Sequence, residues 1–577
     1  MRHGILGVAI ASCLLLPAFT WAAPGIPASP RPSVSAEDAQ ALCATALRIR
    51  KQHSTDLSRV ASAGIVMLSG RGFAFRDDSW KAFTASDPTV SQYFHSSAWL
   101  IPLYDDDSTL AIDLLLEQAA ASADPGGGAG RDSLRRTGWA EYHVTLRLWA
   151  GLCLYARSSD ARILSVLDAL IAANLDESRY YGPPRRPPHT HGVFANEALR
   201  AAGELLGRPD LVSRASLRLH DMFQGVFDPC GMVREQSSFY QALNIRIWTR
   251  NLGPGMSEED RAVLQRARSA LAALIRPDGV LQPIGDGVLG AWSAADLAAL
   301  GVSSGGSVFC PDTGWAAVHR APPAGRPQHH IVRFGPAPRM HGHADHGAAT
   351  WWVGPAPGDG LPVLADRGLF DNSADARRRW ADSPQAHSVL RLQGEDFIGR
   401  TAGEQLSADG VDAYRLVTSK RRGTATRVLT FVRDSFVLGS ADTFRVASGP
   451  AARPVQSWHL DPGWVPSSAH TAVTRDGAHT LDIFCLVQDA VIAPALVPVE
   501  HFAGYRTPVG ALEARCGAPR GRDIRFETII AVDLPDARVR VVDGHLTLET
   551  ASTSYAFAPD GLLAPRPASR GVAQSLG

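Results

Sequence analysis

The chain has 577 residues, of which 45% are hydrophobic and 20% charged, so it is a folded protein of two or more domains and not a disordered one. Its 57 Lys and Arg residues equal its 57 Asp and Glu residues. This zero net charge gives no sign of nucleic acid or of an anionic membrane surface as a partner, although it is compatible with a local basic groove for an acidic ligand.

The first residues, MRHGILGVAIASCLLLPAFTWAAPG, predict a signal peptide over residues 1–22. Arg2 supplies the positive start, an apolar run follows, and Ala22 ends a segment with the usual cleavage spacing. The stretch ending at Cys13 also fits a lipoprotein acylation box, but the apolar run continues past Cys13, which favours cleavage over lipid attachment. No later segment is long and apolar enough to span a bilayer. We therefore expect a periplasmic or secreted protein.

Six cysteines follow the predicted signal peptide, and no two of them form a Cys-x-x-Cys pair. This scatter argues against a cysteine zinc site. In an oxidising compartment one or two disulfides are expected, and the sequence does not give their pairing. The six are Cys43, Cys153, Cys230, Cys310, Cys485 and Cys516.

Residues 36–305 have helical periodicity in segment after segment, such as YHVTLRLWAGLCLYAR and ARILSVLDALIAANL. Many similar amphipathic helices with short Gly/Pro linkers predict a toroid of helical hairpins. Residues 308–555 instead contain short β-branched, often alternating segments with turn residues between them, which predict an antiparallel β-sandwich. Residues 556–577, rich in Ala, Pro and Gly, are expected to be a loose tail. The fold class is thus multidomain α + β.

Histidines cluster in the stretch MHGHADH, where His341 and His343 lie on one side of an extended segment. Downstream, Asp366 ends an apolar strand and His387 begins another. Imidazoles and a carboxylate on neighbouring strands predict a zinc site with an open position. The alternative is a set of polar turn residues.

Two further stretches carry candidate groups in the helical part. His189 and His191 precede a predicted helix, where a loop histidine and free backbone amides can contact an anion or simply cap the helix. In REQSSFYQALNIR, Tyr240 opens a helix close to Arg234 and Arg246. Tyrosine acts as a base only where positive charge lowers its pKa from about 10. The alternative is a tyrosine that packs on the helix face.

These stretches together resemble the heparinase II/III-like polysaccharide lyases, in which an active-site cleft lies between a helical toroid and an antiparallel β-sandwich. The resemblance rests on motifs in the family's order: a His-Gly turn, Glu-x-Ser-x-x-Tyr, a PDG…PIGD loop, His-x-His-x-Asp, an Asp-ending strand and a later His. Here these are His191-Gly192, Glu235 to Tyr240, Pro277 to Asp286, His341 to Asp345, Asp366 and His387.

The resemblance implies β-elimination at a uronic acid in an acidic polysaccharide, with no organic cofactor. It makes Tyr240 the base or acid, His341 its partner and His191 a catalytic group near the substrate carboxylate. It also implies a structural zinc held by His343, Asp366 and His387. The predicted substrate-binding residues are Thr190, His189, Glu235, Arg234 and Arg246.

Three positions depart from the family pattern. Thr190 stands where an Asn amide is usual, Gln241 where a His often follows the tyrosine, and Phe370 where a second tyrosine is expected. Two alternatives therefore stay open: a non-catalytic protein that binds or exports acidic glycan on a lyase scaffold, and a toroid glycoside hydrolase, which needs two carboxylates that flank the bond.

Overall fold

The computed structural model describes residues 35–48, 65–68, 71–74, 88–130, 134, 137–253, 256–320, 326–338, 340–354, 360–372, 375–393, 399–420, 422–433 and 435–567. The predicted signal peptide, residues 1–22, lies outside this set. Among the described helices, none has the length and apolar character that a membrane span requires.

Helices make up most of the first half of the chain, and several of them have capping residues at their ends. Ser257 and Asp260 form a reciprocal capping box at one helix start, and Gly207 ends another helix in the left-handed conformation. The helices are α1 (Ala36–Arg48), α4 (Pro88–His95), α5 (Leu100–Asp106), α6 (Ser108–Ala121), α8 (Glu141–Ser158), α9 (Ile163–Leu175), α10 (Thr190–Leu206), α11 (Pro209–Val226), α12 (Ser238–Leu252), α13 (Glu258–Ala273) and α14 (Ala294–Ala299). A short hairpin, β1 (Ile65–Leu68) and β2 (Arg71–Ala74), also lies in this half.

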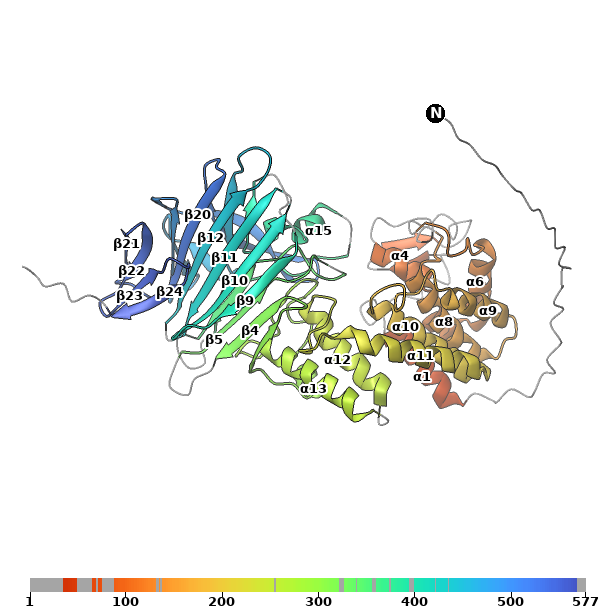
Figure 1. The fold of residues 1–577 in the computed structure, drawn as a ribbon. Coiled ribbons are helices and arrows are strands. Elements are labelled where there is room, and N and C mark those ends of the chain that lie inside the picture. The colour runs from red at the N-terminus through yellow and green to blue at the C-terminus, as the bar shows by residue number, and fades with distance from the viewer. Residues whose placement is uncertain are drawn as a thin grey trace, which may run out of the picture.

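The helices bury two apolar clusters. One unites residues of α5, α6, α8, α9 and α10, and the other unites α11, α12 and α13 with the first strands of the β region. Figure 1 shows α12 and α13 between the remaining helices and strands β4 and β5. The helical and β regions therefore share a packed boundary.

The β region has two main layers. One is a nine-stranded antiparallel sheet of β14 (Trp464–Pro466), β15 (Thr471–Thr474), β16 (Thr480–Val487), β20 (Asp523–Val532), β12 (Val437–Val446), β11 (Gly423–Val432), β10 (Val411–Lys420) and β9 (Thr401–Leu406), with β17 (Ala490–Ile492) beside β16. The other layer combines β3 (Ser307–Cys310), β4 (Trp315–Arg320), β5 (Gln328–Arg333), β6 (Ala349–Val353) and β7 (Leu361–Leu364) with β18 (Ala495–Gly504), β19 (Thr507–Gly517), β13 (Pro454–His459) and β8 (Leu390–Leu392).

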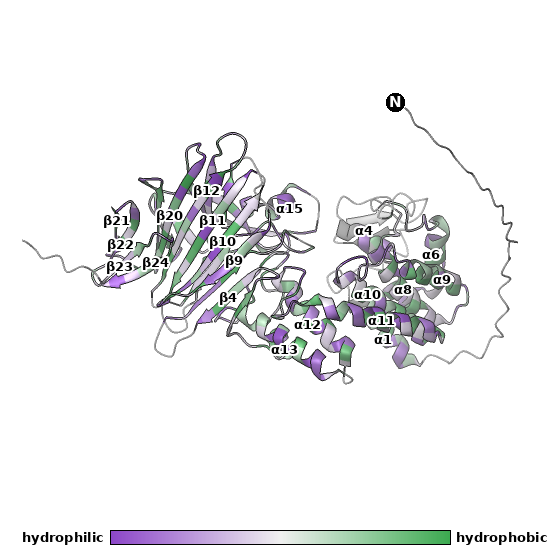
Figure 2. Ribbon diagram, viewed as in Figure 1, coloured by the Kyte–Doolittle hydropathy of each residue, from purple (hydrophilic) through white to green (hydrophobic). Residues whose placement is uncertain are grey.

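A bridge between Leu364 and Leu460 joins the two sheets of that second layer. A single apolar cluster lies between the layers and includes Trp351, Phe431 and Trp458. Apolar and polar residues alternate along the broad strands, as Figure 2 shows for β10, β11 and β12. The predicted fold class, a helical region followed by an antiparallel β-sandwich, is confirmed.

The structure differs from two of the expectations. Residues 563–567 of the predicted loose tail form strand β24 (Leu563–Pro567), which pairs with β23 (Thr553–Phe557) in a sheet with β21 (Arg538–Val542) and β22 (His545–Glu549). Leu563 packs with Val437 and Ile529 of the nine-stranded sheet, and this burial orders the segment. The cysteines form three disulfides and not one or two: Cys43–Cys153, Cys230–Cys310 and Cys485–Cys516.

Candidate active site at the boundary of the two regions

Tyr240 and His341 meet where the helical and β regions join. Tyr240 lies in the first turn of α12, and His341 lies on the connection between β5 and β6. Their rings are stacked, with centroids 3.5 Å apart and planes inclined by 8°. Both side chains are partly exposed. The structure thus brings together two predicted groups that are 101 positions apart in the chain.

The loop before Asp286 holds the His341 connection against α12. The Asp286 backbone amide donates a hydrogen bond of 2.8 Å to the carbonyl of His341. Ser238, at the start of α12, donates its amide to Ile284 and accepts the amide of Ile284 at its hydroxyl. Gly285 adopts a φ of +61° between these contacts. The PIGD stretch is therefore a packed strut and not only a turn.

Asp286 is the electrostatic centre of the site. Its Oδ2 lies 2.8 Å from His341 Nδ1, and its Oδ1 lies 3.0 Å from His343 Nε2 and 2.6 Å from a guanidinium nitrogen of Arg378. Burial alone would raise the pKa of Asp286, but His341, His343 and Arg378 outweigh it and hold that pKa well below its ordinary value. The ionised carboxylate accepts the Nδ1–H of His341, so Nε2 is the nitrogen that carries no proton in the neutral imidazole.

Glu235 approaches the opposite nitrogen of the same imidazole. Its Oε2 lies 3.4 Å from His341 Nε2, its Oε1 accepts a 3.1 Å hydrogen bond from Asn244, and the Thr190 hydroxyl lies 3.5 Å from Oε2. Burial raises the pKa of the Glu235 carboxyl, although His341 and Asn244 oppose the shift. Glu235 is thus a buried carboxyl beside the two stacked rings, and its burial opposes ionisation.

Positive charge does not lower the pKa of Tyr240 below its usual value. Burial and the carboxylates of Asp286 and Glu235 raise that pKa well above its usual value of 10. Arg246 lies instead over the Trp292 ring, 4.6 Å from its centroid. Tyr240 therefore keeps its phenolic proton in the protein without substrate.

The two predicted arginines do not join this group. Arg246 is six positions after Tyr240 on α12, which turns it to another face of the helix. Arg234 has its electrostatic effect on Asp228, whose pKa it lowers against the raising effect of burial. Arg234 and Arg246 were predicted to bind substrate, but among the described residues neither of them contacts Tyr240 or His341.

The start of α10 brings His189, Thr190 and His191 to the same place. The His189 ring caps the helix by accepting the backbone amide of His191 at Nδ1, and it lies 5.5 Å from the His341 ring. His191 is held from α8 on two sides. Its ring stacks on Tyr142 at 4.2 Å, and its Nδ1 lies 3.4 Å from Glu141 Oε1.

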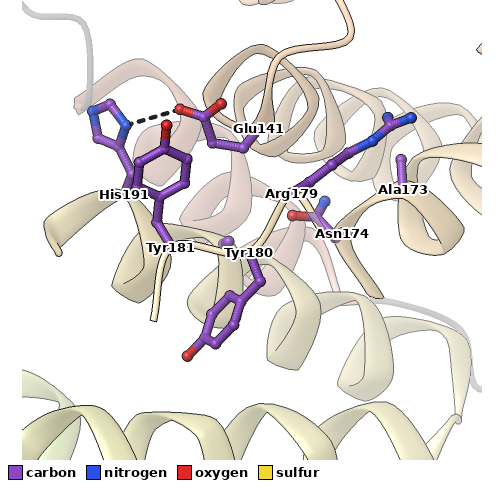
Figure 3. A pocket seen from close by; sticks show the side chains of 8 residues that line it. Glu141, Ala173, Asn174, Arg179, Tyr180, Tyr181 and His191 are labelled. Carbon is purple, nitrogen blue, oxygen red and sulfur yellow. Dashed lines mark hydrogen bonds and ion pairs between the residues drawn. The ribbon is translucent and has the colours of Figure 1, made fainter. Parts of the chain in front are cut away.

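Figure 3 shows a small pocket that His191 helps to line, with Glu141 joined to the imidazole by a dashed line. The Tyr181 ring points toward His191 in this view, whereas Tyr180 points away. Tyr180 in turn accepts a hydrogen bond from Asn196. The pocket is therefore lined by His191 and does not include the stacked pair of Tyr240 and His341.

Two of the departures from the family pattern have structural roles. Gln241 is fully buried and binds three backbone groups: it accepts from the Val233 amide and donates to the carbonyls of Gly231 and Ala267. Phe370 packs against Phe502 at 5.0 Å. Neither side chain contacts the stacked pair in the described part of the chain.

His343, Asp366 and His387 lie together as predicted for a metal, with one ligand atom of each within 4.8 Å of the others. His387 Nε2 donates to the carbonyl of Ala381, which leaves Nδ1 toward Asp366 at 2.9 Å. His343 Nε2 faces Asp286, and its buried Nδ1 has no hydrogen-bond partner among the described residues. Two imidazoles and a carboxylate with such outer partners fit three positions of a tetrahedral zinc site.

Two other groups have ligand atoms equally close but fit a metal less well. In the group of His189, Glu235 and His341, His189 accepts a hydrogen bond at Nδ1, so its Nε2 carries the proton. In the group of Asp286, His343 and Asp382, the guanidinium of Arg378 already contacts both carboxylates. A cation from the chain thus takes the place that a metal would fill.

Four residues of the site were not predicted from the sequence: Asn244, Glu141, Tyr142 and Arg378. Asn244 had a usable signal, because a residue four positions after Tyr240 lies on the same helix face. The others come from α8 and from α15 (Ala376–Ala381), and no local pattern connects those segments to Tyr240.

Comparison with known proteins adds a family to this geometry. Residues 302–508 match the family model described as heparinase II/III-like, C-terminal. The chain contains a heparinase II/III-like C-terminal domain. The predicted resemblance is thereby confirmed, and the domain carries His341 and all three residues that fit a metal. No curated protein matches the sequence.

The fold of nearly the whole chain is also that of solved lyase structures. A heparinase III structure has a TM-score of 0.66 at 11% identity, covering 94% of this chain and 92% of that chain. A mutant of the heparan sulfate lyase HepC from Pedobacter heparinus has a TM-score of 0.55 at 16% identity, covering 92% and 94%. A heparinase III with methylated lysines has a TM-score of 0.58 at 14% identity, covering 92% and 90%. These likenesses establish the fold of the chain.

Proposed function

We propose that this protein is a polysaccharide lyase that cleaves an acidic, uronic-acid-containing polysaccharide by β-elimination. The observation that carries the proposal is the stack of Tyr240 on His341, with Glu235 and Asp286 on opposite nitrogens of the imidazole. A protonated phenol beside an imidazole of fixed tautomer supplies one acid and one base within a single contact. The fold shared with heparinase III and HepC agrees with this chemistry.

The raised pKa of Tyr240 and the hydrogen bond between His341 and Asp286 support the assignment of the two roles. His341, which donates Nδ1–H to Asp286, takes the C5 proton of the uronic acid at Nε2. The electrons of the C5–H bond form the C4–C5 double bond while the C4–O4 bond breaks, and Tyr240 gives its phenolic proton to O4. The imidazolium then returns its proton to the stacked phenolate, which restores both groups.

Glu235 is the group that we propose to neutralise the substrate carboxylate. The C5 proton becomes acidic enough only when the neighbouring carboxylate charge is offset. A buried protonated carboxyl can donate a hydrogen bond to that carboxylate, and burial favours this form of Glu235. Thr190 and Asn244 orient it, and the rings of His189 and His191 lie 4.5 Å apart at the start of α10.

His343, Asp366 and His387 would hold a structural zinc ion beneath this site. When bound, the ion would supply a cross-link between three strand-flanking segments and no proton transfer. The three residues come from the His341 connection, from the segment after β7 and from the segment before β8. Together they hold the His341 connection beside the other two segments.

The two alternatives are less well supported by the geometry. In a hydrolase the two carboxylates would flank the glycosidic bond, but Glu235 and Asp286 contact one and the same imidazole. A non-catalytic glycan-binding protein remains the second candidate because Thr190 and Phe370 depart from the family pattern. The three disulfides are consistent with our further proposal that the protein is exported to the periplasm or secreted.

The test is incubation of the protein with a panel of uronate polymers while ultraviolet absorbance is followed. Elimination creates an absorbing conjugated double bond, hydrolysis creates reducing ends without it, and binding creates neither. Tyr240→Phe is expected to lower kcat by about 10²–10⁴-fold, the contribution of a positioned acid, with substrate binding retained. Tyr104→Phe, a change of the same atoms on α5, is the control and should leave turnover unchanged. Full turnover by Tyr240→Phe would remove Tyr240 from the mechanism.

A further inference from the structure

Arg378 belongs to a short helix that neither the motifs nor the proposed acid–base pair include. Helix α15 carries three consecutive arginines, of which Arg377 and Arg379 are exposed. Arg378 alone turns inward, and its side chain is only 17% exposed. One of its guanidinium nitrogens lies 2.6 Å from Asp286, and its Nε lies 3.0 Å from Asp382. A single guanidinium therefore bridges two carboxylates from different segments.

Both carboxylates that Arg378 binds also contact histidines of the site. Asp286 contacts His341 at 2.8 Å, and Asp382 lies 3.3 Å from His343 Nε2. The carbonyl of Asp382 also accepts the backbone amide of Ala344 at 2.9 Å. The His341–Ala344 connection is thus tied to α15 by side-chain and backbone contacts.

Helix α15 is itself fixed at its C-terminal end, which makes Arg378 a preorganised group. The Ala381 carbonyl accepts a hydrogen bond of 3.1 Å from the buried His387, and Ala381 packs with Phe370 and Phe502. Asp375 caps the other end of the helix by accepting the Arg378 amide at 2.8 Å. An arginine on a helix anchored at both ends loses little freedom when it binds Asp286.

We propose that Arg378 is a positioning residue for the catalytic imidazole. Its guanidinium fixes the carboxylate of Asp286, which in turn fixes the Nδ1–H of His341 and the stack on Tyr240. This chain of contacts requires no change of protonation. Each group acts by holding the next one in its position. The turnover part of the inference rests on the proposed lyase function, whereas the structural part does not.

Arg378→Met tests the inference, because methionine keeps much of the apolar stem and removes the guanidinium. Arg377→Met is the matched control, since the neighbouring Arg377 pairs with the exposed Glu500 and lies over the Phe370 ring, and neither of these contacts involves Asp286 or His341. We expect kcat of Arg378→Met to fall at least about tenfold while KM stays within about threefold, because the substrate contacts remain. Guanidinium at a concentration that does not denature the protein should restore part of the activity of Arg378→Ala, and the same concentration of sodium chloride should not.

A second measurement works without turnover. In protein labelled with 15N-histidine, the Nδ1–H of His341, identified by its loss in His341→Gln, should exchange slowly with water. It should be broadened or lost in Arg378→Met and retained in Arg377→Met. If Arg378→Met does not fold, Arg378→Lys replaces it, because lysine keeps a charge but cannot bridge both carboxylates.

The outcomes separate the two proposals. A His341 Nδ1–H that is sharp in the wild-type protein and broadened in Arg378→Met, together with a wild-type protein that eliminates no polymer, would contradict the lyase function and keep the positioning role. An unchanged Nδ1–H signal with an unchanged kcat in the Arg378 variant would overturn the positioning role and keep the lyase function.

Discussion

Gly285 gives the sharpest structural test of the site, because no other residue type fits the position. Its φ is +61°, and a Cβ there would lie 2.5 Å from the carbonyl oxygen of His341 and 2.8 Å from that of Gln236. Both neighbours are backbone atoms, so neither can swing aside as a flexible side chain would. Gly285→Ala therefore forces the Asp286 loop away from the His341 connection or away from α12.

The cost follows from two separate effects. Placing alanine in the left-handed region costs about 1–2 kcal/mol. Forcing an extra methyl group into a packed contact costs about a further 1–3 kcal/mol. Gly279, in the same loop, supplies the control because its φ is +81° and nothing lies within 4 Å of its added Cβ. Gly279→Ala should thus show only the first cost.

The assay is urea unfolding of both variants beside the wild-type protein, followed by the absorbance assay for elimination. We expect the free energy of unfolding of Gly285→Ala to be lower than that of Gly279→Ala by about 1–3 kcal/mol, the packing cost. Elimination should fail in Gly285→Ala, because a shifted loop parts Asp286 from His341, and it should persist in Gly279→Ala. Equal stability and equal turnover of the two variants would refute the strut that we describe.

Two further substitutions test the metal ligands and the buried hydrogen bonds at the start of α12. His387→Ala should abolish stoichiometric zinc in elemental analysis, because one of three ligands is lost. His479→Ala, which removes a histidine paired with Asp533 elsewhere, should keep the zinc. Zinc retained in His387→Ala would contradict the ligand set. Gln241→Leu should lower the free energy of unfolding by at least about 2 kcal/mol, because three buried backbone groups lose their partner. A urea midpoint equal to that of the wild-type protein would show that those groups find other partners.

The sequence predicted the two-part fold because its periodicity changes where the fold does. Helical spacing ends near residue 305, and the first strand of the sandwich begins at Ser307. The pairing of Tyr240 with His341 was also accessible, since each residue lies in a local motif and the order of the motifs is that of a family. The tail was misjudged because composition does not report that Leu563 finds an apolar surface to cover.

The arginines show where reading along the chain fails. Arg234 and Arg246 were selected because they are close to Tyr240 in sequence, but six positions along a helix lead to another face. No local signal marks Arg378, because three consecutive arginines are typical of a solvated surface. Only the packing of α15 against the His341 connection decides which of the three turns inward, and that packing depends on contacts from four separate segments.

The substitution at position 190 is best understood together with Asn244. The resemblance led us to expect a lost amide donor for the substrate carboxylate, and the Thr190 hydroxyl indeed lies toward Glu235, 3.5 Å from its carboxyl. An amide is present on α12 as Asn244, but it too donates to Glu235. Since both donors are directed at Glu235, the proposed mechanism needs Glu235 itself to offer the proton that meets the uronate. Replacing Asn244 by leucine would then weaken elimination through the position of Glu235, and not through a contact with the sugar.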